Sequence, residues 1–209
     1  MSKFNLISHP ILQHKLTKMR EKDTNSIGFR GLMNEIGKFL AFEATRNIET
    51  ETFDIETPVA KTKGIRPKAY PMVVSIMRAG NGMLDGVLET LPYASAGHIG
   101  IYRDKFINNT VEYYFKLPPN AKGRDVLLLD PMLATGDTMI AAIDRLKQYN
   151  VGKITLLSVL VSPQGLERLH YFHPEVEIYA LSKEEGLNDK GYLVPGMGDA
   201  GDRLYNTTK

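Results

Sequence analysis

The chain has 209 residues, 43% of them hydrophobic and 24% charged, which is ordinary for a globular protein and predicts one domain over residues 1–209. Its 26 Lys and Arg residues nearly balance 24 Asp and Glu residues, so nucleic acid is not indicated as a partner, and the lack of cysteine excludes disulfides and zinc-cysteine sites. No stretch approaches the ~20 apolar residues of a membrane span and the N-terminus lacks the apolar core of a signal peptide, so we expect a cytoplasmic protein without a membrane partner.

The first fifty residues are expected to be helical. Pro10 suits the first turn of a helix. Six apolar side chains fall on one face of a second helix, namely Phe29, Leu32, Met33, Ile36, Phe39 and Leu40. Four basic residues in the first helical region are expected to form a solvated face, namely Lys15, Lys18, Arg20 and Lys22.

From residue 71 the pattern changes to short apolar runs separated by amphipathic segments. The runs predict strands near 72–77, 99–102, 111–117, 126–129, 154–161 and 176–181. The amphipathic segments predict helices near 82–91, 138–149 and 163–171. This alternation favours an α/β fold with a mostly parallel sheet flanked by helices. The runs 99–102 and 111–117 instead predict an antiparallel pair, with a turn at Asn108-Asn109.

The segment 126–138 joins an apolar strand to a helix through a small, hydroxyl-rich loop. A phosphate in such a loop would meet unpaired backbone N–H groups and the positive end of the helix dipole. Gly136 lets the backbone approach closely, and the Thr135 and Thr138 hydroxyls can donate hydrogen bonds. Asp130 ends the strand, where a carboxylate can accept from ribose hydroxyls or reach a metal. The alternative is an ordinary strand-to-helix turn capped by Thr138.

Two further stretches carry groups suited to an anionic ligand. Arg78 follows the predicted strand 72–77 and precedes glycines that can expose backbone N–H groups to an anion. Asp199 lies in a C-terminal tail rich in Gly, Asp and Asn. The alternatives are a surface arginine in a flexible turn and a plain Gly-Asp turn.

The segment Asp130–Thr138 resembles the phosphoribosyl diphosphate (PRPP) motif of the type I phosphoribosyltransferases, and its Asp-Pro-Met-Leu form resembles the uracil phosphoribosyltransferases. Four other segments are similar to the same family: 76–86, 102–104, 111–114 and 191–203. The resemblance implies the type I phosphoribosyltransferase fold with a flexible β-arm. It also implies a base-binding hood, made by residues 1–50 and 183–209, around a core of residues 70–182.

The resemblance implies that uracil and PRPP react to give UMP and diphosphate, as in pyrimidine salvage. It implies Mg²⁺ as cofactor, held mainly through PRPP rather than by a metal site of the chain. The implied catalytic residues are Arg78, Arg103, Asp130 and Asp199. The residues implied to bind PRPP are Arg78, Arg103, Asp130, Pro131, Met132, Leu133, Ala134, Thr135, Gly136, Asp137, Thr138 and Asp199. Those implied to bind uracil are Leu193, Gly198, Asp199 and Ala200.

Two residues depart from the family pattern. Asp137 stands where uracil enzymes usually have glycine, and we expect its carboxylate to point toward solvent, because a negative charge directed at a phosphate would weaken binding. Asn81 stands where an apolar residue is common. Neither departure removes a residue with an implied role.

Two other functions stay open from the sequence. One is a nucleotide-sensing regulator on the same fold, and the other is a phosphoribosyltransferase for another base. The resemblance also leaves open a GTP effector. The apolar N-terminal helices indicate a homodimer or a larger homo-oligomer.

Overall fold

The computed structural model describes residues 3–104 and 109–207, and it describes residues 103, 104 and 109 by their backbone alone. Among these residues, eight strands form one sheet in the order β1-β10-β9-β7-β4-β5-β6, with β8 paired to β9. The strands of this sheet are β1 (Phe4–Leu6), β4 (Met72–Met77), β5 (Ala96–Asp104), β6 (Asn109–Lys116), β7 (Val126–Leu129), β8 (Met132–Leu133), β9 (Ile154–Val161) and β10 (Glu177–Lys183). The helices are α1 (Pro10–Arg20), α2 (Ser26–Ala44), α3 (Asn81–Thr90), α4 (Asp137–Lys147), α5 (Pro163–Phe172) and α6 (Ala200–Tyr205).

The predicted fold class is confirmed, because the sheet is parallel except for the pair β5 and β6. The bounds of β4, β7 and β9 agree with the predicted strands, and the other three predicted strands shift by a few residues. The antiparallel pairing of β5 with β6 was predicted, whereas the turn predicted at Asn108-Asn109 lies outside the described residues.

The N-terminal region differs from the prediction at two places. Residues 4–6 form a strand that pairs with β10, so the chain enters the sheet before its first helix begins. Phe39 of α2 is 44% exposed, whereas Phe29, Met33 and Leu40 on the same helix are fully buried. The predicted face was therefore too wide, and Phe39 lies outside the stripe of α2 that packs on the sheet.

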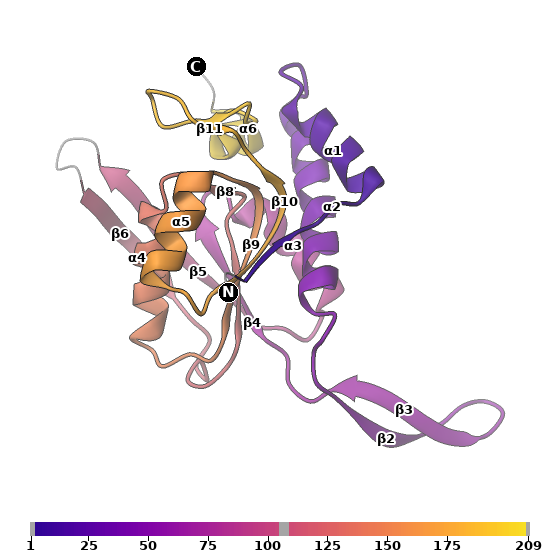
Figure 1. Cartoon of the computed structure of the whole chain (residues 1–209). Coiled ribbons are helices and arrows are strands. Elements are labelled where there is room, and N and C mark those ends of the chain that lie inside the picture. The colour runs from indigo at the N-terminus through magenta and orange to yellow at the C-terminus, as the bar shows by residue number, and fades with distance from the viewer. Residues whose placement is uncertain (1–2, 105–108, 208–209) are drawn as a thin grey trace.

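Helices cover both faces of the sheet, as Figure 1 shows, with α4 and α5 on one side and α1, α2 and α3 on the other. Side chains of a strand alternate between the two faces, so neighbouring residues of β4 enter different cores. Val73 packs with the residues of α1, α2 and α3, while Met72 and Val74 pack with those of α4 and α5. This double burial explains why the central strands are continuous apolar runs.

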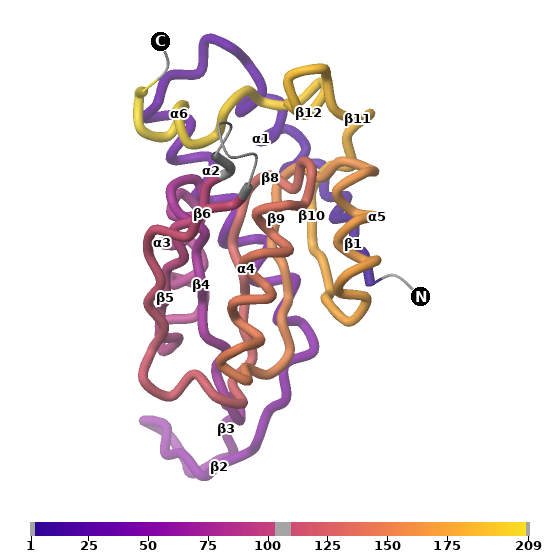
Figure 2. The backbone as a smooth tube through the Cα atoms, turned by 90° about the vertical axis from the view of Figure 1, so that its left-hand side faces the viewer, coloured from indigo at the N-terminus to yellow at the C-terminus, as the bar shows by residue number. Residues whose placement is uncertain are grey.

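Two smaller pairs of strands lie outside the main sheet. The hairpin of β2 (Thr50–Glu56) and β3 (Lys61–Pro67) projects from the body of the molecule in Figure 1, and the sequence had not predicted it. The pair β11 (Gly186–Leu187) and β12 (Leu193–Val194) belongs to the C-terminal segment. That segment and α6 lie at the same end of the sheet as β8 in both views (Figures 1 and 2). This end holds the carboxyl termini of the parallel strands.

Candidate active site

The predicted site residues gather at the carboxyl edge of the sheet, where open α/β folds bind ligands. Residues 78–82, called here the diphosphate loop, follow β4, and residues 130–138, called here the phosphate loop, follow β7. The diphosphate loop packs against the end of β7, directly before the phosphate loop, because a Cβ atom placed on Gly80 would lie 2.3 Å from Leu129 O. Only glycine fits at that position without displacing the end of β7. The peptide bond between Met77 and Arg78 is cis.

The phosphate loop turns into α4 at Gly136, whose φ of 88° is a left-handed conformation that favours glycine. Gly136 precedes the helix and has no side chain to cap it, and α4 begins at Asp137, so the alternative of a turn capped by Thr138 is wrong. Asp137 N donates to Thr135 Oγ1 at 3.5 Å. The first N–H groups of a helix have no intrahelical partner. The turn therefore leaves donors and the positive end of the helix dipole for an anion.

The first half of the phosphate loop is held by the sheet. Pro131 O accepts hydrogen bonds from the N–H groups of Val159 and Leu160, and Leu133 O accepts one from Ser162 N at 2.9 Å. The Leu133 side chain is buried in the core. Pro131 and Leu133 can consequently meet a ligand through only a small part of their surface, and their main role in the structure is to anchor the loop.

Asp130 lies between β7 and β8 at the start of the phosphate loop. Burial raises the pKa of its carboxyl to about 7, and the hydrogen bond that Met132 N donates to Oδ1 at 3.2 Å offsets this only in part. With a pKa of about 7, this carboxyl can bind a proton near neutral pH. Ribose hydroxyls donated to the carboxylate would favour the ionised form.

Arg78 contacts the C-terminal helix α6. Its Nη2 donates to Asp202 Oδ1 at 2.9 Å, and its backbone oxygen accepts from Tyr205 Oη at 3.2 Å. Its Nη1 donates to Thr207 Oγ1 at 3.4 Å, and the arginine side chain is still 52% exposed at the start of the diphosphate loop. The guanidinium group is thus placed where a diphosphate bound to residues 78–82 would meet it.

The predicted role of Arg103 falls outside what the structure describes. Its backbone belongs to β5, but its side chain lies outside the described residues, as does the segment 105–108 that follows it. Arg103 stays a prediction from the resemblance.

Residues 193–200, called here the base loop, hold the residues predicted to bind uracil. The Leu193 and Ala200 side chains are buried, so these residues could offer a base little more than their backbone groups. Gly198 has a φ of 77°, which only glycine adopts without strain. Asp199 caps α6, accepting from Asp202 N at 2.8 Å, so its carboxylate has a structural partner in this state.

A buried ion pair holds the base loop, and the sequence had not predicted it. Arg20 of α1 donates to both carboxylate oxygens of Glu184, at 2.8 and 2.6 Å. The same pair binds Gly196, because Arg20 donates to Gly196 O at 2.7 Å and Glu184 accepts from Gly196 N at 2.8 Å. Arg20 is therefore not part of a solvated face, and that expectation was wrong. Burial alone would raise the pKa of Glu184, but the hydrogen bonds from Arg20, Ser182 and Gly196 outweigh it and lower that pKa.

Arg203 joins the same loop to the N-terminal helices. Its guanidinium group donates to Met197 O at 2.9 Å, to Met19 O at 2.6 Å and to Glu21 O at 2.7 Å. The ring of Phe29 lies 4.4 Å below the guanidinium carbon. Arg20 and Arg203 thus connect α1 and α2 to the base loop, over sequence separations that no local pattern indicates.

Both departures from the family pattern have polar partners. We had expected the Asp137 carboxylate to point toward solvent, and this expectation was wrong. The Asp137 side chain is only 17% exposed, and its Oδ1 lies 2.5 Å from Arg168 Nη1. Asn81 accepts a hydrogen bond from Ser75 Oγ at 2.7 Å, and that hydroxyl also lies 2.9 Å from His98 Nδ1. Asn81, the first residue of α3, therefore accepts a hydrogen bond from the hydroxyl of Ser75, which is buried in β4.

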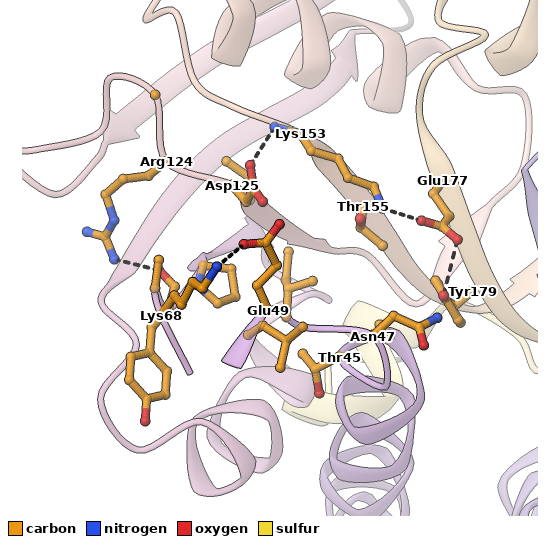
Figure 3. A pocket seen from close by; sticks show the side chains of 18 of the residues that line it. Thr45, Asn47, Glu49, Lys68, Arg124, Asp125, Lys153, Thr155, Glu177 and Tyr179 are labelled. Carbon is orange, nitrogen blue, oxygen red and sulfur yellow. Dashed lines mark hydrogen bonds and ion pairs between the residues drawn. The ribbon is translucent and has the colours of Figure 1, made fainter. Parts of the chain in front are cut away.

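A hollow of about 810 Å³ lies at the opposite, amino edge of the sheet (Figure 3). It is lined by residues that precede or begin the strands, such as Pro71, Val126 and Lys153. Four of its charged side chains form two ion pairs, Lys153 with Glu177 at 2.5 Å and Lys68 with Glu49 at 3.1 Å, and Arg124 donates to Ser95 Oγ and Tyr70 O. The candidate active site is therefore the set of loops at the carboxyl edge, and this hollow is not assigned to it despite its size.

Within residues 3–104 and 109–207, no three His, Asp or Glu side chains form a group that could hold a metal ion. None of the helices in the described part of the chain is long and apolar enough to cross a membrane.

Comparisons with known proteins agree with this geometry. The family model for uracil phosphoribosyltransferase matches residues 6–207. The chain is 51% identical to a uracil phosphoribosyltransferase of Legionella pneumophila, over 97% of this chain and 95% of the relative. It is 47% identical to one of Polaromonas naphthalenivorans, over 99% of this chain and 100% of the relative.

Solved structures show the same fold. A protein from Aquifex aeolicus superimposes with a TM-score of 0.92 at 35% identity, over 98% of this chain and 99% of that chain. The adenine phosphoribosyltransferase of Leishmania donovani superimposes with a TM-score of 0.61 at 12% identity, over 91% of this chain and 88% of that chain, which shows likeness of fold alone.

Proposed function

Because this chain belongs to the uracil phosphoribosyltransferase family, we propose that it transfers the phosphoribosyl group of PRPP to uracil, giving UMP and diphosphate. The observation that carries the proposal is that the diphosphate loop and the phosphate loop follow the neighbouring parallel strands β4 and β7 at the carboxyl edge of the sheet, with Gly80 packed against the end of β7. The base loop belongs to the C-terminal segment, directly before α6, at the same end of the sheet. The chain thus offers a place for each part of PRPP and for the base.

The reaction breaks the bond between the ribose and the diphosphate, while positive charge builds on the ribose ring. The N–H groups of residues 135–138 would bind the 5′-phosphate, and Asp130 would accept hydrogen bonds from the ribose hydroxyls. Arg78 and Arg103 would stabilise the negative charge of the leaving diphosphate. These groups position the substrate and stabilise charge, so the proposed catalysis is mainly electrostatic.

Uracil would be read by backbone groups of the base loop. Along one edge uracil presents an acceptor, a donor and an acceptor, and a glycine-rich loop can present the complementary N–H and C=O groups. Cytosine changes two of these three positions, which would leave buried polar groups unpaired. The buried side chains of Leu193 and Ala200 fit this proposal, since they leave mainly the backbone for the base.

We propose that Mg²⁺ reaches the site bound to the oxygens of PRPP. The chain's donors support this assignment, because Asp130 is a single carboxyl and Asp199 is engaged as the cap of α6. The ion would supply positive charge to the departing diphosphate. The diphosphate loop, which begins with Arg78, is the part of the chain placed to receive such a charged group.

A turnover assay tests the proposal. The purified protein is mixed with PRPP, Mg²⁺ and uracil, cytosine, hypoxanthine or adenine in turn, and the nucleotide products are separated. We expect UMP from uracil and at most traces from the other bases. Comparable turnover of a purine would instead support a phosphoribosyltransferase for another base, and PRPP binding without turnover would support a regulator.

Arg78→Ala is expected to raise the KM for PRPP by about tenfold or more, because a charge-assisted hydrogen bond to the diphosphate is lost. The melting temperature should change little, since the arginine is half exposed and its ion pair with Asp202 is at the surface. The matched control is Asp202→Asn, which removes the ion pair but keeps Arg78. If the control were impaired as strongly as Arg78→Ala, the arginine would serve to hold α6 and not the diphosphate.

The proposal includes a homo-oligomer, with GTP as an effector. Exposed apolar side chains on α2 and on the projecting hairpin support the assembly, namely Ile27, Phe39, Phe42, Val59 and Ile65. The family resemblance is the support for GTP. Light scattering with and without GTP tests both, and a monomer in both conditions would contradict them. The cytoplasmic location expected from the sequence stays a prediction.

A further inference from the structure

Arg168 lies on α5, across from the phosphate loop, and the reaction as described gives it no role. Its Nη1 lies 2.5 Å from Asp137 Oδ1 and donates to Thr135 O at 3.4 Å. The side chain of Arg168 is 48% exposed, and that of Asp137 is 17% exposed. One guanidinium group therefore binds a side chain and a main-chain oxygen of the loop that is proposed to hold the 5′-phosphate.

The charge of Asp137 explains why such a partner matters. Asp137 is the first residue of α4 and directly follows Gly136, where the loop turns. A carboxylate this close to a bound phosphate would repel it and weaken binding. Asp137 also accepts from Thr135 Oγ1 at 3.0 Å, which keeps the carboxylate folded back on the loop. With Arg168 opposite, the net charge of the pair is zero.

Arg168 also affects the direction of the loop amides. Ser162 at the start of α5 donates to Ala134 O at 2.5 Å, and Arg168 donates to Thr135 O. Both peptide bonds that follow these oxygens are trans, so each N–H points opposite to its carbonyl. The N–H groups of Thr135 and Gly136 are consequently directed away from α5.

The contact between α5 and the loop is close. A Cβ atom on Gly165 would lie 2.4 Å from Ala134 O and 3.0 Å from Leu133 O, so the first turn of α5 touches the loop backbone. The first turn of α5 thus packs directly against the backbone of the phosphate loop.

We propose that Arg168 is a positioning residue for the 5′-phosphate: it neutralises Asp137 and holds the Thr135 carbonyl against α5, so that the loop amides face the phosphate. This inference rests on the proposed function and assigns Arg168 a task within it. Arg168 acts through Asp137 and the loop and makes no contact with the substrate.

A double-mutant cycle tests the inference with ribose 5-phosphate, which carries the 5′-phosphate without the diphosphate. Its binding to the full-length protein is measured by calorimetry for Arg168→Gln, Asp137→Asn and the double variant. We expect Arg168→Gln to weaken binding about tenfold and Asp137→Asn to change it less than about threefold. The double variant should recover most of the affinity, because the repelling charge is gone.

Several readouts separate positioning from a general structural role. In steady-state assays the KM for PRPP should rise in Arg168→Gln while the KM for uracil stays the same. Arg168→Lys keeps the charge and should retain most of the affinity. The matched control is Arg145→Gln on α4, where the arginine pairs with Glu112 at 3.1 Å and is 33% exposed. It should bind ribose 5-phosphate as the wild type does.

Two results would overturn the inference. One is a double variant as weak as Arg168→Gln alone, which would mean that Arg168 does not act through Asp137. The other is wild-type affinity in Arg168→Gln. Failure of the proposed function is separable, because a protein that forms no UMP can still show the coupling in ribose 5-phosphate binding.

Discussion

Asp130→Asn is expected to reduce turnover and to raise the KM for PRPP by roughly ten- to a hundredfold. The substitution keeps the shape of the side chain but removes the carboxylate that we propose accepts from the ribose hydroxyls, and a charged hydrogen bond contributes on the order of 1–3 kcal/mol. Steady-state kinetics with PRPP as the varied substrate measures the effect. Wild-type kinetics in this variant would remove Asp130 from the site.

The raised pKa of Asp130 adds a pH dependence to this result. Because burial raises that pKa to about 7, the carboxylate is depleted below neutral pH, and the affinity of the wild type for PRPP should increase as the pH rises from 6 to 8. PRPP itself titrates in this range, so Asp130→Asn is the control. The variant should show only the part of the pH dependence that belongs to the substrate.

The same pKa predicts how the stability of the ligand-free protein changes with pH. A carboxyl whose pKa is raised by folding binds its proton more tightly in the folded state, so the free energy of unfolding falls as the pH rises from about 4 to about 7. The asparagine of the Asp130→Asn variant cannot ionise, so the free energy of unfolding of this variant should not show this fall. Urea denaturation at pH 5 and pH 8 compares the two, and an equal loss of stability in the variant would contradict the prediction.

Glu184→Ala is expected to lower the free energy of unfolding by about 3 kcal/mol or more, because it leaves Arg20 without its partner inside the protein. The Glu184 side chain is 1% exposed and that of Arg20 is 24% exposed, so water can replace the lost contacts only in part. The variant also removes the acceptor of Gly196 N. Urea denaturation at pH 7 measures the loss, and a loss as small as that of a surface pair would contradict the prediction.

The pH dependence of the stability loss distinguishes the broken ion pair from a general loss of packing. Since the pKa of Glu184 is lowered by folding, its contribution is present above the unfolded pKa of about 4.3 and is lost as the pH falls below it. The difference between Glu184→Ala and the wild type should therefore narrow in acid. Glu43→Ala, which breaks an exposed pair with Arg46, is the control and should lose much less stability.

The loss of the Glu184 carboxylate should also change the KM for uracil, because Glu184 binds Gly196 of the base loop. Gly196 loses a hydrogen bond that fixes its position, so the KM for uracil is expected to rise more than the KM for PRPP in Glu184→Ala at a temperature where the variant is folded. The conservative variant Glu184→Gln keeps one acceptor oxygen and should be intermediate in both stability and uracil affinity. An equal rise of both KM values would indicate a general loss of structure.

Local sequence patterns determined the central strands and the order of the loops at their ends. The runs that became β4, β7 and β9 are almost entirely apolar because both faces of the sheet are covered, and that signal is contained in a few consecutive residues. The phosphate loop was equally local, since its acid, hydroxyls and glycine lie within 130–138. Arg78 and Asp130 could be placed at one edge because parallel strands end on the same side.

Only the tertiary structure decided which partners the charged side chains have. Arg20 pairs with Glu184 across 164 residues, and Arg78 contacts Asp202 across 124 residues, so no periodicity or spacing could indicate either contact. The expectation for Arg20 came from the basic residues near it in sequence, and that for Asp137 came from the family pattern and the charge of a phosphate. Both were wrong because neither source shows which side chain lies opposite in the fold. An ion pair depends on where two side chains end in space, and the packing of α1 and α5 against the loops sets that position.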